Sequence, residues 1–257
     1  MSPGIESALK PQTVSAFDQY VALTEKRISA EIAENAPFVS NETGARGNVA
    51  NAYAALRRGE VKIEKLETLD AGHRIDCPNG IIHHWTGVIF IPGATLDAAL
   101  QLLQDYDRQS VIYAPEVEKS RTISRSGDDF HIFLRFRRKK VITVVLDTEH
   151  DVRYTRIDAT HAASKSVSTS VREVADPGTA RERDLAAGDG GGYLWRINAY
   201  WRFEQRDGGV YVRCESVSLT RDIPAGLGWL IGPFVTSIPR ESLQFTLEST
   251  RKALTNK

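Results

Sequence analysis

The second half of the sequence alternates apolar and polar residues with a period of two, which is the pattern of half-buried β-strands. The alternation is clearest in residues 193–206, where one face would hold Tyr193, Trp195, Ile197, Ala199, Trp201 and Phe203. The other face would hold Leu194, Arg196, Asn198, Tyr200, Arg202 and Glu204. This pattern predicts an antiparallel sheet that is covered on one side and largely wet on the other.

The same alternation of apolar and polar residues extends over most of the chain after Pro115. It predicts strands at about 117–125, 129–138, 141–158, 161–174, 192–206 and 210–220. Turn signals separate most of these strands, and residues 126–129 and 206–209 have the composition of hairpin connections. Upstream, residues 81–93 form a strand-like apolar run, and Thr95 is a candidate N-cap for the helix that follows.

The chain ends in an amphipathic helix. Its apolar stripe consists of Leu243, Leu247, Thr250 and Leu254, and Ser237 is a candidate N-cap. Antiparallel strands with helices at the ends of the sequence indicate an α+β fold. The terminal helix can cover the apolar face of the sheet.

The first third of the chain differs from this pattern. Residues 12–34 and 48–58 have helical spacing, and residues 61–66 have an imperfect strand alternation. We therefore divide the chain into an N-terminal helical extension, residues 1–80, and a main domain, residues 81–257. The pattern leaves open whether the extension packs on the main domain or forms a mobile arm.

Charge and cysteine content argue against several function classes. Lys and Arg number 33, as do Asp and Glu, so the chain has no basic excess for a nucleic-acid partner. Cys77 and Cys214 form no CxxC pair and the histidines form no HExxH motif, so we expect neither a metal nor a cofactor. Whether the two cysteines pair stays open.

The sequence contains no segment that would direct it to a membrane. No apolar run reaches the roughly 18 residues of a membrane span, and the first residues lack the layout of a signal peptide. We expect a soluble protein that is cytoplasmic by default. The same picture fits an exported protein whose leader has been removed.

One apolar loop leads into the terminal helix, in the stretch DIPAGLGWLIGPFVTSIPRESLQFTLESTRKAL at residues 222–254. Together with IIHHWTGVIFIPGATLDAALQLLQDYDRQSVIYAPEV at residues 81–117 and the strands between, this order resembles the START-like (SRPBCC) superfamily. That superfamily is also called pollen-allergen-like or polyketide-cyclase-like, and the resemblance covers about residues 81–255. It implies a helix-grip fold, in which a curved antiparallel sheet of about six to seven strands wraps around a long C-terminal helix.

The resemblance also implies an apolar cavity between sheet and helix, with the 222–236 loop as its gate. On this basis we expect the protein to bind a lipid, a sterol-like molecule or an aromatic polyketide for transport, storage or sensing. We expect transient membrane contact as well, and no nucleic-acid partner. The candidate ligand-binding residues are Tyr113, His131, Phe133, Arg135, Trp195, Ile197, Trp201, Phe203, Trp229, Phe234, Leu243 and Leu247.

Arg135 gives the most specific expectation among these residues. It shares a strand face with His131 and Phe133. If it points inward, it is a buried cation and needs an anionic partner or a ligand headgroup. Arg135 belongs to a basic run that consists of Arg135, Arg137, Arg138, Lys139 and Lys140. This run is either a contact site for an anionic lipid surface or a solvated hairpin end.

Two other functions stay open. A cyclase-, aromatase- or hydrolase-like enzyme would use polar cavity residues, for example His150 with a tyrosine as an acid/base pair. A protein-interaction module would have a filled cavity and bind its partner through residues 1–80. Two polar side chains converging in a deep cavity would favour the enzyme, a smooth apolar cavity the carrier, and a filled core the module.

Overall fold

The computed structural model describes residues 9–39, 46–139, 142–186, 189–222 and 237–255. The helices are α1 (Pro11–Ala33), α2 (Arg46–Arg57), α3 (Leu96–Gln104), the short 3₁₀ helix η1 (Tyr106–Arg108), α4 (Gln109–Ile112) and α6 (Ile238–Thr255). The strands are β1 (Lys62–Lys65), β2 (Leu69–Asp70), β3 (His73–Arg74), β4 (Gly80–Pro92), β5 (Val117–Ser126), β6 (Asp129–Lys139), β7 (Thr143–Arg156), β8 (His161–Ala175), β9 (Arg183–Asp184), β10 (Arg196–Arg206) and β11 (Gly209–Arg221).

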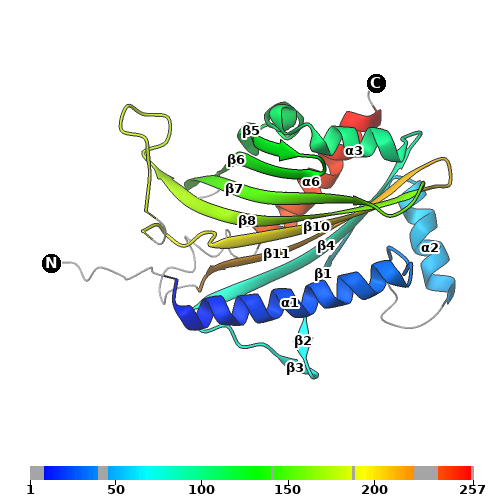
Figure 1. The fold of residues 1–257 in the computed structure, drawn as a ribbon, viewed down its shortest axis with the longest axis horizontal. Coiled ribbons are helices and arrows are strands. Elements are labelled where there is room, and N and C mark those ends of the chain that lie inside the picture. Colours follow the sequence, from blue (N-terminus) through cyan, green and yellow to red (C-terminus); the bar gives the residue numbers. More distant parts are fainter. Residues whose placement is uncertain (1–8, 40–45, 140–141, 187–188, 223–236, 256–257) are drawn as a thin grey trace.

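One large antiparallel sheet organises this part of the chain (Figure 1). Its strand order is β1-β4-β11-β10-β8-β7-β6-β5, and β9 pairs with β8 to make nine strands among the described residues. The predicted α+β class is confirmed, with a C-terminal helix on the sheet and a helix at the N-terminus. The sheet exceeds the expected six to seven strands because β1 adds to one edge and the short β9 pairs with the end of β8.

The sequence around the hairpins explains why neighbouring strands pair directly. Asp207 and Gly208 have φ of 54° and 75°, the left-handed conformation that a two-residue hairpin turn needs at both central positions. The β10–β11 ladder then runs in register from Arg206 opposite Gly209 to Arg196 opposite Leu219. Strand β10 begins later than predicted, at Arg196, so residues 193–195 precede it.

Helix α6 packs on the inner face of the sheet through its predicted apolar stripe. Leu243, Leu247 and Leu254 are buried in the main core with Ile89 and Val212 of the sheet. The helix can approach this closely because β4 has a glycine at the crossing point. A Cβ at Gly87 would overlap the Leu247 side chain and would lie 2.7 Å from Ile63 Cδ1.

The outer face of the sheet is covered by α1, so the expectation of a largely wet face is wrong there. Phe17 and Tyr20 of α1 pack with Tyr200, Val217 and Leu219 of the sheet in a separate apolar cluster. Residues that were expected to face water are buried against this helix. The extension also contributes β1, which pairs with β4.

The contact between α1 and the sheet is ionic as well as apolar. Glu31 accepts hydrogen bonds from Arg202 Nη1 at 3.1 Å and Arg213 Nη1 at 3.0 Å. Glu215, 2% exposed, accepts from Arg213 Nη2 at 2.9 Å and His84 Nε2 at 2.8 Å, and Arg27 also pairs with it. Each buried charge therefore has a partner of opposite sign, which is the condition for tolerating it.

The pKa of Glu215 reflects this network. Burial raises its pKa, but the His84 hydrogen bond and the charges of Arg27 and Arg213 outweigh burial and lower the pKa to about 2. The carboxylate is therefore ionised under ordinary conditions. Its charge is part of what holds α1 to the sheet.

We predict that Gly87→Val destabilises the protein by about 1–3 kcal/mol, because the new side chain has to displace Leu247 and α6. Chemical denaturation would measure the free energy of unfolding. Ser124→Val, at an exposed position of the edge strand β5, is the matched control and should change it by less than about 0.5 kcal/mol. Equal stability of the two variants would show that α6 does not depend on this close approach.

We predict that Glu31→Gln lowers the free energy of unfolding by about 3 kcal/mol, because it leaves the buried Arg202 and Arg213 short of negative charge. Glu34→Gln, an exposed change at the end of the same helix, is the control. Denaturation by urea would compare them. A loss no larger than that of the control would mean that the ionic contact contributes nothing net to stability.

Candidate functional site

A cavity of about 260 Å³ lies between the inner face of the sheet and the N-terminal half of α6. Its walls come from β6, β7, β8, β10 and β11, from residues 238–246 of α6 and from the α3–α4 segment. Apolar side chains form most of the lining. The cavity exists because α6 packs tightly near Gly87 but faces small side chains farther along the sheet.

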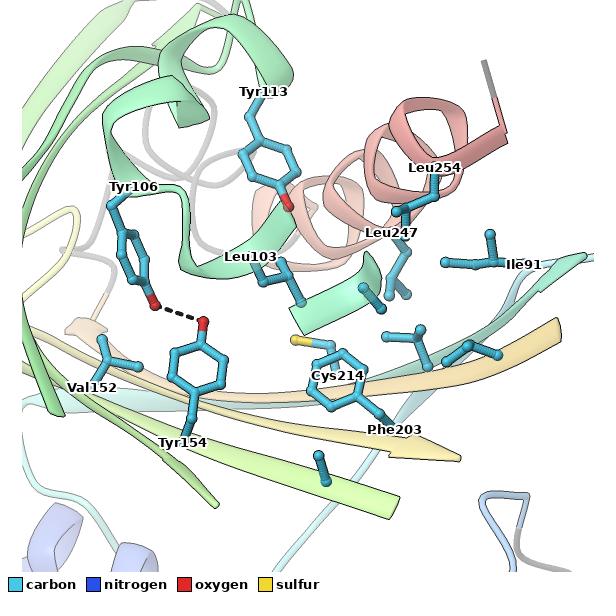
Figure 2. Packing of buried hydrophobic residues seen from close by; sticks show 14 of the residues in the cluster. Ile91, Leu103, Tyr106, Tyr113, Val152, Tyr154, Phe203, Cys214, Leu247 and Leu254 are labelled. Carbon is cyan, nitrogen blue, oxygen red and sulfur yellow. Dashed lines mark hydrogen bonds between the residues drawn. The ribbon is translucent and has the colours of Figure 1, made fainter. Parts of the chain in front are cut away.

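Tyr106, Tyr113 and Tyr154 line the cavity, and Figure 2 shows them among the buried side chains of the core. Tyr106 and Tyr154 point their hydroxyls at each other with an O–O distance of 2.8 Å. The Tyr113 hydroxyl donates to Thr250 Oγ1 at 2.9 Å, since Thr250 uses its own hydrogen on Thr246 O. Burial raises the pKa of all three tyrosines, so they are neutral and already hydrogen-bonded within the protein.

Small hydroxyl side chains line the sheet side of the cavity. In the ladder, Ala199 lies between Ser166 of β8 and Ser216 of β11, while Ile197 lies opposite Ser218. Cross-strand partners share a face of the sheet, so these residues form one continuous patch. Their small volume leaves the space that larger apolar residues would fill.

His150 of β7 is a buried titratable group in the cavity lining. It is 5% exposed, and its Nε2 lies 2.9 Å from Thr148 Oγ1. Its Nδ1 lies 3.4 Å from the hydroxyl of Ser166. Burial, with a smaller contribution from the charge of His131, lowers the pKa of His150 to about 4, so the ring is neutral near pH 7.

Arg138 is the one permanently charged side chain in the cavity lining that the described residues provide. It forms an ion pair with Glu116 and donates from Nε to Ser242 Oγ at 3.1 Å. Burial lowers its pKa, and the charge of Glu116 opposes that shift. The positive charge of Arg138 is therefore already paired with the negative charge of Glu116.

The structure brings part of the predicted ligand-binding set to the cavity. Tyr113, Ile197, Trp201 and Leu243 line it. Phe203 and Leu247 are buried in the adjoining core without lining it, and Trp195 packs on the outer cluster beneath α1. Trp229, Phe234 and all of the expected gate loop except Asp222 lie outside the described residues.

The predicted residues of β6 lie on the other face of the sheet. Ile132, Leu134 and Phe136 face the cavity, so His131, Phe133 and Arg135 point away from it. Arg135 is buried although it does not point inward, and its anionic partners are in the protein: Asp147 at 2.6 Å from Nε and Nη2, and Glu182 at 2.6 Å from Nη1. The structure therefore leaves Arg135 no place in ligand contact.

The other two residues of that face also have partners on the outer surface. His131 Nδ1 lies 2.8 Å from Asp151 Oδ1. The guanidinium of Arg121 lies 4.4 Å from the centre of the Phe133 ring, a cation–π contact. The alternation in β6 puts Phe130, Ile132, Leu134 and Phe136 on one apolar face, and this is the face that turns inward.

Several cavity residues were missed from the sequence. The sequence does not distinguish Tyr106 and Tyr154 as cavity residues, because single tyrosines in helix and strand patterns are usually core residues. The serines were detectable in principle, since HAASKSVSTS at residues 161–170 carries small residues at every second position. His150 was considered only for the enzyme alternative, although it lines the cavity.

Other chemistry is sparse in the part of the chain that the structure describes. Cys77 and Cys214 are both free thiols, and they belong to clusters on opposite faces of the sheet. No group of His, Cys, Asp and Glu residues could hold a metal ion among the described residues. No described helix combines the length and apolar character needed to cross a membrane.

No family model and no curated protein sequence matches the chain. Solved structures with a similar fold include a fragment of the STAR-related lipid transfer protein from Xanthomonas axonopodis, with 16% identity and a TM-score of 0.45 over 75% of this chain and 98% of that one. Human STARD10 has 9% identity and a TM-score of 0.47 over 83% of this chain and 81% of that one. The Zhui aromatase/cyclase from Streptomyces sp. R1128 has 15% identity and a TM-score of 0.38 over 68% and 90%.

These structures match the resemblance that the sequence predicted. They include STAR-related lipid transfer proteins and an aromatase/cyclase, which are protein classes that the START-like resemblance also names. The TM-scores are below 0.5 and the identities are 16% or less. The likeness therefore carries no argument about ligand or activity.

We predict that acid destabilises the protein through its buried neutral histidines. Burial lowers the pKa of both His83 and His150 to about 4, whereas the unfolded chain has the ordinary histidine value of about 6.5. Between these values the unfolded state binds more protons, so the free energy of unfolding falls as the pH drops from about 6.5 to about 4. Each histidine would contribute a loss of up to about 3 kcal/mol over this range.

Urea denaturation at several pH values would measure this slope in the wild type and in His150→Asn. The variant should show a shallower slope, because it lacks one of the two groups. His73→Asn is the control, since His73 is exposed on β3. A variant slope as steep as that of the wild type would mean that His150 takes up its proton without unfolding the protein.

Proposed function

We propose that the protein binds one small hydrophobic molecule in the cavity between the sheet and α6, for transport, storage or sensing. The observation that supports this most directly is a mostly apolar cavity of about 260 Å³ inside the main core. Concave apolar sites with a few placed polar groups are the usual form of small-molecule sites. A core built only for stability would fill such a space, because each void forfeits packing contacts.

The size of the cavity favours a compact ligand. Small-molecule sites commonly measure about 300–1,000 Å³, so this cavity of about 260 Å³ lies just below that range. A ligand with two or three fused rings, or a single short acyl chain, fits this volume better than a lipid with two long chains. Among the predicted ligand classes, which are lipids, sterol-like molecules and aromatic molecules, we therefore favour the smaller molecules of each class.

One observation favours the enzyme alternative. His150 and Ser166 converge in the cavity, with Nδ1 and Oγ 3.4 Å apart. An activated serine requires a base that a third group orients for proton transfer, commonly a carboxylate. Here the far nitrogen of His150 meets the hydroxyl of Thr148 at 2.9 Å, and no carboxylate lies in the described lining. The carrier is therefore the function we propose first.

Native mass spectrometry of the purified protein, followed by organic extraction, tests the binding directly. We expect one bound molecule per chain, or an empty protein that takes up the neutral fluorescent probe N-phenyl-1-naphthylamine. Neither bound molecule nor probe uptake would contradict the proposed function. Turnover of an ester or polyketide-like substrate that depends on His150 would instead support the enzyme.

We predict that Ala199→Phe weakens probe binding by at least about tenfold, because the added ring occupies the middle of the cavity wall. Fluorescence titration would give the dissociation constant. Ser124→Phe adds the same ring at an exposed position of β5 and should bind like the wild type. Unchanged affinity of Ala199→Phe, with its fold intact by circular dichroism, would place the binding site elsewhere.

A further inference from the structure

The sheet side of the cavity carries polar atoms that the protein does not use. Ser164, Ser216 and Ser218 line the cavity, and their hydroxyls have no hydrogen-bond partner among the described residues. Ser164 and Ser218 are 6% and 5% exposed. These hydroxyls can be reached from the cavity, so a water molecule or a ligand oxygen there can hydrogen-bond to them.

His150 differs from the serines because its hydrogen-bond role is determined. Thr148 donates its single hydroxyl hydrogen to Leu134 O at 3.0 Å. Thr148 Oγ1 therefore acts as the acceptor toward His150 Nε2, 2.9 Å away, and the ring hydrogen is on Nε2. The other nitrogen, Nδ1, then carries a lone pair and can only accept.

The lone pair on Nδ1 is poorly satisfied by the protein. Its sole protein partner among the described residues is Ser166 Oγ, at 3.4 Å. A hydroxyl donor usually approaches a nitrogen or oxygen acceptor within about 3 Å, so this contact is weak. An O–H group of a molecule in the cavity could replace it with a shorter hydrogen bond.

The charges around the cavity disfavour an ionised ligand. Arg138 is paired with Glu116, so a carboxylate in the cavity would have to compete for a cation that is already matched. The remaining described lining has neither a second Arg or Lys nor an acidic side chain. Burying an unpaired charge is far more costly than burying a hydroxyl that finds a partner.

We propose that the cavity selects a neutral hydroxyl-bearing molecule, a phenol or an alcohol, whose O–H group donates to His150 Nδ1. The neighbouring hydroxyls of Ser164, Ser216 and Ser218 hydrogen-bond to further oxygen atoms of the same molecule. This selectivity rests on the proposed function, because it concerns the occupant of the same cavity. It separates such a ligand from a fatty acid, which is charged, and from a hydrocarbon, which has no donor.

Four ligands of similar shape test this in the wild-type protein by isothermal titration calorimetry at pH 7.5. They are 2-naphthol, which donates, 2-methoxynaphthalene, which only accepts, 2-methylnaphthalene, which does neither, and 2-naphthoate, which is charged. We expect 2-naphthol to bind at least about tenfold more tightly than the other three, since a site built to pair with a hydroxyl rejects analogues that lack it.

Two variants locate the acceptor. His150→Leu should abolish the preference for 2-naphthol over 2-methylnaphthalene, while retaining affinity for the latter. His150→Asn, whose amide oxygen can accept near the place of Nδ1, should retain part of the preference. A full preference in His150→Leu would assign the selectivity to another group and would overturn the role of His150.

The outcomes separate this selectivity from the function on which it rests. Equal binding of 2-naphthol, 2-methoxynaphthalene and 2-methylnaphthalene would overturn the selectivity and leave the hydrophobic carrier intact. Tightest binding of 2-naphthoate would overturn it in favour of charge recognition at Arg138. If none of the four ligands nor N-phenyl-1-naphthylamine binds, the proposed function fails and the selectivity fails with it. Should His150→Leu not fold, the comparison of ligands in the wild type still decides.

Discussion

The close packing of α6 on β4 is the contact on which the rest of the inner face depends. Gly87 has no side chain, so Leu247 can reach the strand backbone and the helix lies against one edge of the sheet. Farther along, the helix faces Ser166, Ala199 and Ser216, which are too small to reach it. The same helix therefore completes a solid core at one end and covers a cavity at the other.

The two faces of the sheet are stabilised by different chemistry. The inner face has apolar side chains and hydroxyls, whereas the outer face carries the charged groups Arg202, Arg213 and Glu215, all at most 7% exposed. These charges are tolerable because α1 supplies Glu31 and Arg27 as counterions. The helical extension therefore completes the fold, since without α1 Arg202 and Arg213 would lose Glu31 as a counterion and Glu215 would lose Arg27.

Polar groups inside the cavity fall into two sets, which differ in whether the protein already satisfies their hydrogen bonds. Tyr106, Tyr113 and Tyr154 are paired with one another or with α6, so they are structural. His150 Nδ1 has only the long contact to Ser166, and the hydroxyls of Ser164, Ser216 and Ser218 have no partner among the described residues. A protein that needed only stability would gain by replacing the second set with apolar residues, because unpaired buried polar groups cost more than they contribute.

The sequence by itself determined the long strands β4 to β8, β10 and β11, the hairpin at Asp207-Gly208 and the apolar stripe of α6, because these follow from local periodicity and turn geometry. On β6 the alternation already separated an apolar face, with Phe130, Ile132, Leu134 and Phe136, from the face that carries Arg135, but it did not show what Arg135 pairs with. Only the tertiary structure placed Arg135 with Asp147 and Glu182, and joined Glu31 to Arg202 and Arg213 across more than 170 positions of the chain. The tertiary structure also decided the cavity. Its volume depends on how many side chains from distant parts of the sequence pack together, and no single residue determines it.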